Sequence, residues 1–247
     1  MPVKSTVVTP QLPDAVFWDM DGTLVDTEHY WLAAEEKLVR SFGGDWSWQD
    51  GVQLVGSGLW NSARVLQDYG VRLGEDEIVA ALTATVLSHL EREVPWRPGA
   101  VELLGVLREA GIKTALVTMS VRSLAEHVAG AIGFPAFDAM VTGDEVGEAK
   151  PHPGPYLTAA DRLGVDPLRS VAIEDSIPGL TSATRAGMVT IGVPHTVALM
   201  PENGYHLLPT LTDFGLIELA ELFNRPLHGP QGGVAIGTAH RADGYPS

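Results

Sequence analysis

Apolar residues outside positions 28–95 follow two alternating patterns. Short continuous apolar runs are typical of buried strands; one ends at Trp18, and the others lie at 114–118, 139–142, 170–173 and 189–193. Apolar residues three and four positions apart predict helices over about 100–110, 121–131, 156–163 and 180–186. Strands that alternate with helices form parallel sheets covered on both faces. The pattern therefore predicts an α/β fold built on a parallel sheet.

Residues 28–95 show a helical pattern only. Apolar residues at three- and four-residue steps predict one helix that begins near Tyr30, and two more over about 58–69 and 78–93. Pro95 and Pro98 then mark the return to the alternating pattern. We therefore expect an all-helical insertion, or cap, in this part of the chain.

The domain organisation follows from this change of pattern. Residues 12–27 and 96–225 are expected to form the α/β core, which includes a last helix over 216–223, and residues 28–95 the helical cap. Residues 226–247 are rich in glycine and proline and have little to bury, so we expect a disordered tail.

The composition limits the possible partners and chemistry. With 31 acidic and 16 basic residues the formal charge is -15, and such a field repels nucleic acids and anionic lipid surfaces. The chain has no cysteine, which excludes disulfides, thiolate metal sites and a cysteine nucleophile. It has neither a signal-like segment nor a run of about 18 apolar residues. We expect a cytoplasmic protein without nucleic-acid or membrane partners, and the sequence predicts no oligomeric state.

The first apolar run ends in two carboxylates, Asp19 and Asp21, followed by Gly22. Alternate residues of a strand point to the same side, so both carboxylates can face one point. Two negative charges this close raise a pKa or recruit a cation. Glycine then frees the backbone to leave strand geometry. We interpret Asp19 as a nucleophile, Asp21 as a proton shuttle and Mg²⁺ as the compensating charge.

Three other strand ends carry groups suited to phosphate chemistry. Thr118 ends the second strand and Ser120 precedes a helix, where a hydroxyl and a helix N-terminus can bind a phosphate oxygen. Lys150 lies in a loop that prolines keep from becoming helical, so its ammonium group has a fixed position. Glu174 and Asp175 follow the fourth strand, and their carboxylates suit Mg²⁺, directly or through water. Parallel sheets bind ligands at the carboxyl ends of their strands, so we expect one site.

In this order and spacing the residues resemble the haloacid dehalogenase superfamily of phosphohydrolases, in particular its branch similar to β-phosphoglucomutase. The matching motifs are Asp19-Met20-Asp21-Gly22-Thr23, Thr118, Lys150-Pro151 and Glu174-Asp175. The resemblance implies a Rossmann-like core, a small helical cap and an aspartyl-phosphate intermediate. It also implies that Asp19 attacks phosphorus and Asp21 protonates the leaving oxygen. Mg²⁺ would be held by Asp19, the backbone carbonyl of Asp21, and Asp175.

The resemblance leaves the reaction open. Dehalogenases of the superfamily lack the second aspartate, so Asp21 argues against dehalogenation. A phosphomutase of this branch normally has a cap histidine and two basic residues that hold a second phosphate. Those positions fall on Trp31 and near Gly56, where no cation stands, although Arg64 is one turn away. Hydrolysis is therefore the main hypothesis, and phosphomutase activity is the alternative.

The expected function is that of a Mg²⁺-dependent phosphatase for a small phosphorylated metabolite, such as a sugar or polyol phosphate. We expect Ser120, Gly56 and Trp31 to contact the substrate, with Trp31, Trp60 and Val55 covering the site. A third hypothesis is a module that binds such a metabolite without turnover. The complete set of carboxylate, hydroxyl and lysine side chains argues against it, since binding alone does not require the paired aspartates.

Overall fold

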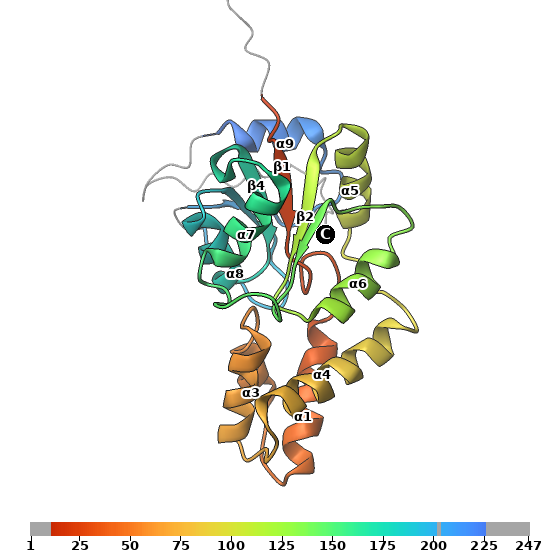
Figure 1. The fold of residues 1–247 in the computed structure, drawn as a ribbon, viewed down its shortest axis with the longest axis vertical. Helices are drawn as coiled ribbons and strands as arrows, with labels where there is room; N and C mark the ends of the chain where they lie inside the picture. Colours follow the sequence, from red (N-terminus) through yellow and green to blue (C-terminus); the bar gives the residue numbers. More distant parts are fainter. Residues whose placement is uncertain (1–10, 202–203, 226–247) are drawn as a thin grey trace, which may run out of the picture.

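The computed structural model describes residues 11–201 and 204–225. Within them, six parallel strands form one sheet in the order β3-β2-β1-β4-β5-β6 (Figure 1). The strands are β1 (Ala15–Trp18), β2 (Lys113–Val117), β3 (Ala139–Val141), β4 (Ser170–Glu174), β5 (Val189–Gly192) and β6 (His206–Leu207). The core helices are α5 (Ala100–Glu109), α6 (Arg122–Gly130), α7 (Gly154–Leu163), α8 (Ile177–Arg185) and α9 (Leu216–Phe223). The predicted α/β fold is confirmed, whereas the predicted disordered tail lies outside the described residues.

The sheet is buried on both faces because its strands have apolar side chains on both sides. In β1, Val16 and Trp18 belong to one apolar cluster, and Ala15 and Phe17 to another, as expected for alternate residues of a strand. The first cluster also contains residues of α5, α6 and α9, and the second contains residues of α7 and α8. The central strand β1 is thus held from both sides, which fixes the backbone that leads into Asp19.

The all-helical insertion lies at one end of the sheet and contains α1 (Glu28–Ser41), α2 (Trp48–Val52), α3 (Leu59–Asp68) and α4 (Glu75–Leu90) (Figure 1). The two chain segments that connect it to the core pair with each other. Val25 forms an antiparallel bridge with Trp96, and the N–H of Asp26 donates to the carbonyl of Pro95 at 2.7 Å. The helical cap is confirmed, and its bounds at residues 28 and 95 stay a prediction.

The sequence analysis misses the short helix α2 and the short strand β6, and it begins α4, α7 and α8 two or three residues too late. Helix α2 has five residues, too few for the spacing of apolar residues to reveal it. Helices α7 and α8 begin before the predicted positions because Pro155 and Pro178 lie in their first turns. Proline is tolerated there, since its missing N–H would have no helical partner.

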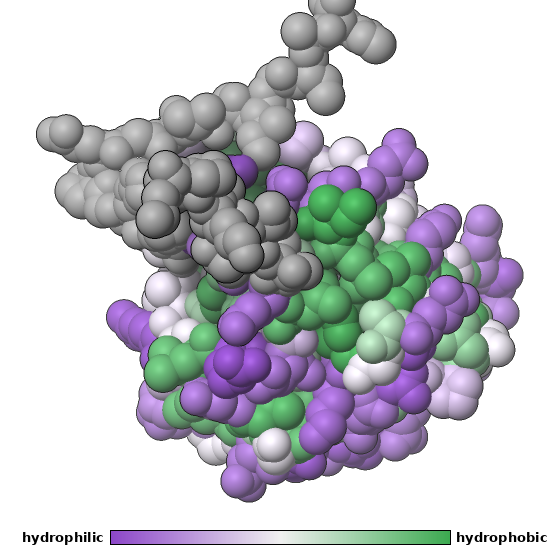
Figure 2. Space-filling model, turned by 90° about the horizontal axis from the view of Figure 1, so that it is seen from above, coloured by the Kyte–Doolittle hydropathy of each residue, from purple (hydrophilic) through white to green (hydrophobic). Residues whose placement is uncertain are grey.

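The end of the molecule opposite the cap has a mixed surface. Seen from above, apolar residues form one large patch and several smaller ones among hydrophilic residues (Figure 2). Exposed apolar area is common on globular proteins, and nothing among the described residues identifies a partner for the patch. In the described part of the chain, every helix is too short or too polar to cross a lipid bilayer.

Candidate active site

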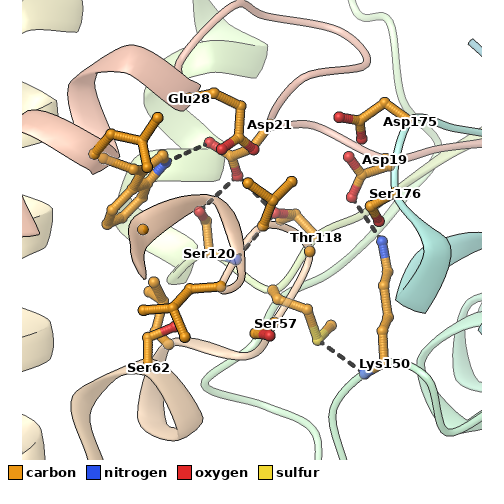
Figure 3. Close-up of a pocket in the computed structure, with 18 of the residues that line it drawn as sticks. Asp19, Asp21, Glu28, Ser57, Ser62, Thr118, Ser120, Lys150, Asp175 and Ser176 are labelled. Atoms are coloured by element: carbon orange, nitrogen blue, oxygen red, sulfur yellow. Dashed lines mark hydrogen bonds and ion pairs between the residues drawn. The ribbon is translucent and has the colours of Figure 1, made fainter. Parts of the chain in front are cut away.

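The catalytic candidates meet at the carboxyl ends of β1 and β4, where the strand order reverses. Trp18 lies opposite Ile173, and the N–H of Asp19 donates to the Ile173 carbonyl at 3.1 Å. Asp19 and Asp175, which follow the two strands, are therefore neighbours. A crevice opens at such a reversal because the chain leaves the adjacent strands in opposite directions. Together with the cap it forms a pocket that is partly open to solvent (Figure 3).

One buried ammonium group connects the catalytic carboxylates. Nζ of Lys150 donates to Oδ1 of Asp19 (2.6 Å), to Oε1 of Glu174 (2.7 Å) and to the carbonyl of Val117 (2.8 Å). The side chain of Lys150 is 1% exposed, so these charges interact in a medium of low polarity. Burial lowers the pKa of Lys150, but the carboxylates of Asp19 and Glu174 outweigh this effect and raise the pKa above its ordinary value. Lys150 is therefore charged, as its predicted role requires.

Glu174 supports that lysine from behind. It is the last residue of β4 and is completely buried. Its Oε1 also accepts from the hydroxyl of Tyr156 (2.6 Å), and its Oε2 accepts from that of Ser176 (3.2 Å). A Cβ at Gly179 would lie 1.9 Å from Oε2, so glycine leaves the room that Glu174 occupies. Both carboxylate oxygens of Glu174 thus have partners within the protein.

Asp175 differs from Glu174 because one of its carboxylate oxygens has no hydrogen-bond partner. Its Oδ1 accepts from Thr23 at 3.2 Å, whereas its buried Oδ2 has no hydrogen-bond partner. Burial, followed by the charge of Asp19, raises the pKa of Asp175. Burial, followed by the charge of Glu174, raises the pKa of Asp19 to about 7, although Lys150 opposes the shift.

These carboxylates form a cluster that could hold a metal ion. One oxygen each of Asp19, Glu174 and Asp175 lies within 4.8 Å of the others. A bound cation would offset the repulsion that raises their pKa values, and hard divalent cations prefer oxygen ligands. Gly22 keeps the site open, because a Cβ there would lie 2.0 Å from Oδ2 of Asp175. The residues present therefore fit a divalent cation, whose identity they leave undetermined.

The side chain of Asp21 lies outside this cluster and faces the cap (Figure 3). Its Oδ1 accepts from the hydroxyl of Thr27 (2.6 Å) and the indole N–H of Trp31 (2.9 Å). Its Oδ2 accepts from the hydroxyls of Ser120 (2.7 Å) and Thr118 (3.3 Å). Two predicted substrate contacts, Ser120 and Trp31, therefore bind Asp21, which connects core strand ends to cap helix α1.

Gly56 and Val55 lie on the pocket wall, as the sequence analysis expects. The backbone of Gly56 has φ of +76°, which favours glycine. A Cβ at Gly56 would lie 2.5 Å from Oγ of Ser176, the residue after Asp175. Glycine at this position lets the cap approach the catalytic loop closely.

Two other cap residues do not reach the site. Trp60 is absent from the pocket wall, and its indole N–H donates to Asp76 at 2.8 Å. The expectation that Trp60 covers the site is therefore wrong. Arg64 pairs with Glu75 at 3.2 Å and is also absent from the wall. Among the described residues that line the pocket, Lys150 is the only lysine, arginine or histidine.

Comparisons with known proteins agree with this geometry. A family model described as haloacid dehalogenase-like hydrolase matches residues 13–187. The chain belongs to the haloacid dehalogenase-like hydrolases. Hexitol phosphatase B of Escherichia coli (strain K12) is 31% identical over 229 residues, which cover 90% of this chain and 99% of that protein.

Solved structures give the same assignment for this hydrolase. CbbY from Rhodobacter sphaeroides, in complex with xylulose-(1,5)bisphosphate, has a TM-score of 0.77 at 29% identity, covering 84% of this chain and 99% of that chain. β-Phosphoglucomutase from Clostridium difficile has a TM-score of 0.75 at 25% identity, covering 86% and 98%. The Rossmann-like core with a helical cap is thus confirmed, as is membership of the branch similar to β-phosphoglucomutase.

Among the side chains at or behind the pocket of this hydrolase that the sequence analysis does not predict are two glutamates, a methionine and a tyrosine. Glu28 and Glu35 line the wall from α1, Met119 lines it from the core, and Tyr156 bonds to Glu174 behind it. Glu35 has a signal in the sequence, since it lies on the apolar face of the helix predicted from Tyr30 onwards, whereas Glu28 precedes that helix. Met119 and Tyr156 have none, because apolar residues in such positions are typical of any core.

Replacing Lys150 with methionine should destabilise the fold, because the carboxylates of Asp19 and Glu174 would stay buried without a cation. Breaking a buried ion pair in this way costs about 3–5 kcal/mol, which urea titration of the free energy of unfolding can measure. The double variant Lys150→Met/Glu174→Gln should recover part of the loss. Lys37→Met, at an exposed position of α1, is the control and should match the wild type. A loss in Lys150→Met below about 1 kcal/mol would contradict the assigned role.

Proposed function

We propose that the protein is a Mg²⁺-dependent phosphatase that hydrolyses a small phosphorylated metabolite, a sugar or polyol phosphate, through an aspartyl-phosphate on Asp19. The observation that carries this proposal is the meeting of Asp19, Lys150 and the partnerless oxygen of Asp175 in one buried pocket. A nucleophile, a fixed cation and a metal ligand are what phosphoryl transfer to a carboxylate requires. The name of the relative hexitol phosphatase B supports the substrate class.

The proposed reaction has two displacements at phosphorus. Lys150 binds Oδ1 of Asp19, so we assign Oδ2 to the attack. As the bond from phosphorus to the alcohol oxygen breaks, Asp21 gives that oxygen a proton. In the second step Asp21 takes a proton from water and the water oxygen attacks phosphorus. The bond between phosphorus and Asp19 breaks, which releases phosphate and regenerates the carboxylate of Asp19. Thr118 and Ser120 hold Asp21 between the core and the cap for both transfers.

Asp19 and Asp175 are the carboxylates that we assign to Mg²⁺, together with the backbone carbonyl of Asp21 that the family resemblance implies. The unpartnered Oδ2 of Asp175 supports this choice. The oxygens of Glu174 bind Lys150, Tyr156 and Ser176. Glu174 would therefore contact the ion through a water molecule, or influence it through the charge of Lys150. Bound Mg²⁺ supplies positive charge that offsets the negative charge of the transferring phosphoryl oxygens.

Hydrolysis is favoured over the phosphomutase alternative because the cap side of the pocket contributes no cation among the described residues. A mutase must bind a second phosphate group while its bisphosphate intermediate reorients in the pocket. Binding that group requires positive charge or many N–H donors. CbbY of this fold was solved with a bisphosphate, so the fold itself does not exclude one. Here Trp31, which occupies the position of the expected histidine, instead binds Asp21. The alternative of a module without turnover has no observation in its favour, since each group of the reaction is present.

Asp19→Asn should abolish the release of phosphate from p-nitrophenyl phosphate and from sorbitol 6-phosphate, because an amide does not attack phosphorus. Trapping by beryllofluoride, which mimics a phosphoryl group on a carboxylate, should disappear with it. Circular dichroism should show an unchanged fold. Asp161→Asn, at an exposed position of α7, is the matched control and should keep full turnover. Turnover by Asp19→Asn would exclude this aspartate as the nucleophile.

Millimolar Mg²⁺ should raise the thermal unfolding midpoint of the wild type, because a ligand that binds only the folded state stabilises it. Asp175→Asn should lose this shift, since it replaces the partnerless carboxylate oxygen. Differential scanning calorimetry with and without EDTA measures both, and Asp161→Asn again serves as the control. An equal shift in Asp175→Asn and the wild type would show that this residue does not bind the ion.

β-Glucose 1-phosphate with Mg²⁺ should yield free phosphate and no glucose 6-phosphate, because nothing on the cap side holds a second phosphate. A coupled glucose 6-phosphate dehydrogenase assay and a colorimetric phosphate assay, run in parallel, distinguish the two products. Glucose 6-phosphate formed faster than free phosphate would favour the mutase.

A further inference from the structure

Helix α1 places on the pocket wall two carboxyl groups that the proposed reaction does not use. Glu28, Trp31, Leu32 and Glu35 recur at i, i+3, i+4 and i+7, which is one face of a helix, and all four line the pocket. Glu28 lies beside Asp21 (Figure 3). Glu35 follows two turns later, about 10 Å along the helix axis. A carboxyl group on a buried helix face costs free energy unless it finds a partner.

Glu35 lacks such a partner for one of its oxygens. The residue is 5% exposed, and its buried Oε2 makes no hydrogen bond. Burial raises the pKa of Glu35 to about 8. The only cation among the described lining residues, Lys150, is bound to Asp19 and Glu174 at the other end of the pocket. Oε2 therefore keeps a hydrogen-bonding position that no described side chain fills.

A second buried polar atom without a partner lies close by. The indole nitrogen of Trp46 makes no hydrogen bond, although the residue is 2% exposed. Gly51, which lines the pocket, lies beside both atoms: a Cβ there would lie 3.0 Å from Oε2 of Glu35 and 3.5 Å from Nε1 of Trp46. The same Cβ would meet Leu32 at 2.4 Å, so a larger residue at this position would displace its neighbours.

The chemistry of these two atoms selects one kind of group. The indole N–H can only donate, and the carboxyl group of Glu35 keeps an acceptor oxygen in either protonation state. A hydroxyl group satisfies both, because it accepts one hydrogen bond and donates another. An ammonium group cannot accept from Trp46. A phosphate or carboxylate would add negative charge beside Glu28 and Glu35, with no described cation on the cap side.

We propose that Glu35, with Trp46, binds a hydroxyl group at the end of the substrate remote from the phosphate, and so selects phosphorylated polyols over esters whose far end is apolar or anionic. The proposal rests on the phosphatase function proposed above and names the group that chooses the substrate. Glu28 lies beside Asp21, and Glu35 follows about 10 Å further along α1, so a phosphate near the paired aspartates and a hydroxyl at Glu35 suit a chain of several carbons. A two-carbon phosphate ester is too short to reach both.

The test compares sorbitol 6-phosphate with n-hexyl phosphate, which has the same chain length and no hydroxyl groups. Wild-type enzyme should prefer sorbitol 6-phosphate in kcat/KM. Glu35→Leu should lower the ratio of the two kcat/KM values at least about tenfold, mainly through KM, because a buried site built for a hydroxyl discriminates by leaving polar groups unpaired. Glu35→Gln keeps hydrogen-bonding atoms and should restore part of the ratio. Trp46→Phe should lower it less than Glu35→Leu.

Glu36→Gln is the matched control, since Glu36 is the next residue of α1 and pairs at the surface with Arg40. Its ratio should equal that of the wild type. An unchanged ratio in Glu35→Leu, or a wild-type enzyme without preference for sorbitol 6-phosphate, would overturn the proposal. Thermal unfolding of each variant shows whether it is folded. If Glu35→Leu does not fold, the ratio of Glu35→Gln is compared with that of the wild type instead.

Calorimetric titration of the Asp19→Asn protein with the same two esters separates this proposal from the phosphatase function. Tighter binding of sorbitol 6-phosphate that is lost in Asp19→Asn/Glu35→Leu supports the role of Glu35 even if the wild type shows no turnover. Equal binding of the two esters, or no binding of either, overturns it even if p-nitrophenyl phosphate is hydrolysed.

Discussion

The ammonium group of Lys150 is the constraint on which the rest of the site depends. Asp19, Glu174 and Asp175 gather where water is largely excluded, and three carboxylates in such a place repel one another strongly. Lys150 offsets part of that repulsion, and Tyr156 holds Glu174 so that the lysine stays directed at the nucleophile. One lysine does not balance three carboxylates. The remaining negative charge lies beside the unpartnered oxygen of Asp175, and this is the physical reason to expect a cation there.

The core of the site is predictable from the sequence because each part is a local signal at the end of an apolar run. Asp19 follows one such run directly, Asp175 follows another after Glu174, and a parallel sheet brings the ends of its strands to one edge. The part played by Glu174 is not predictable in the same way. A glutamate before an aspartate at a strand end suggests a second metal ligand, and only the packing of Tyr156 and Gly179 around it reveals that its oxygens have other partners.

The cap is less predictable, for a reason inherent in helices. The spacing of apolar residues predicts which face of a helix is buried, but it does not say what that face is buried against. Trp31 and Trp60 look alike in the sequence, yet the indole of Trp31 donates to Asp21 in the pocket and that of Trp60 donates to Asp76. Glu35 is visible as a carboxylate on an apolar stripe. Its missing partner emerges only from the positions of Gly51 and Trp46, which belong to the segment after α1.

Helix α1 joins the chemistry of the site to the choice of substrate. Trp31 donates to Asp21, the proposed proton carrier, and Glu35 stands one turn further along the same face. A helix of 14 residues moves as a unit, so a substrate hydroxyl that fixes Glu35 also fixes the position of the Trp31 indole. Contacts at the far end of the substrate would then help to align Asp21 with the leaving oxygen, so that binding energy away from the reacting atoms adds a smaller effect on kcat to its main effect on KM. A substrate without the remote hydroxyl would lose this alignment together with its affinity.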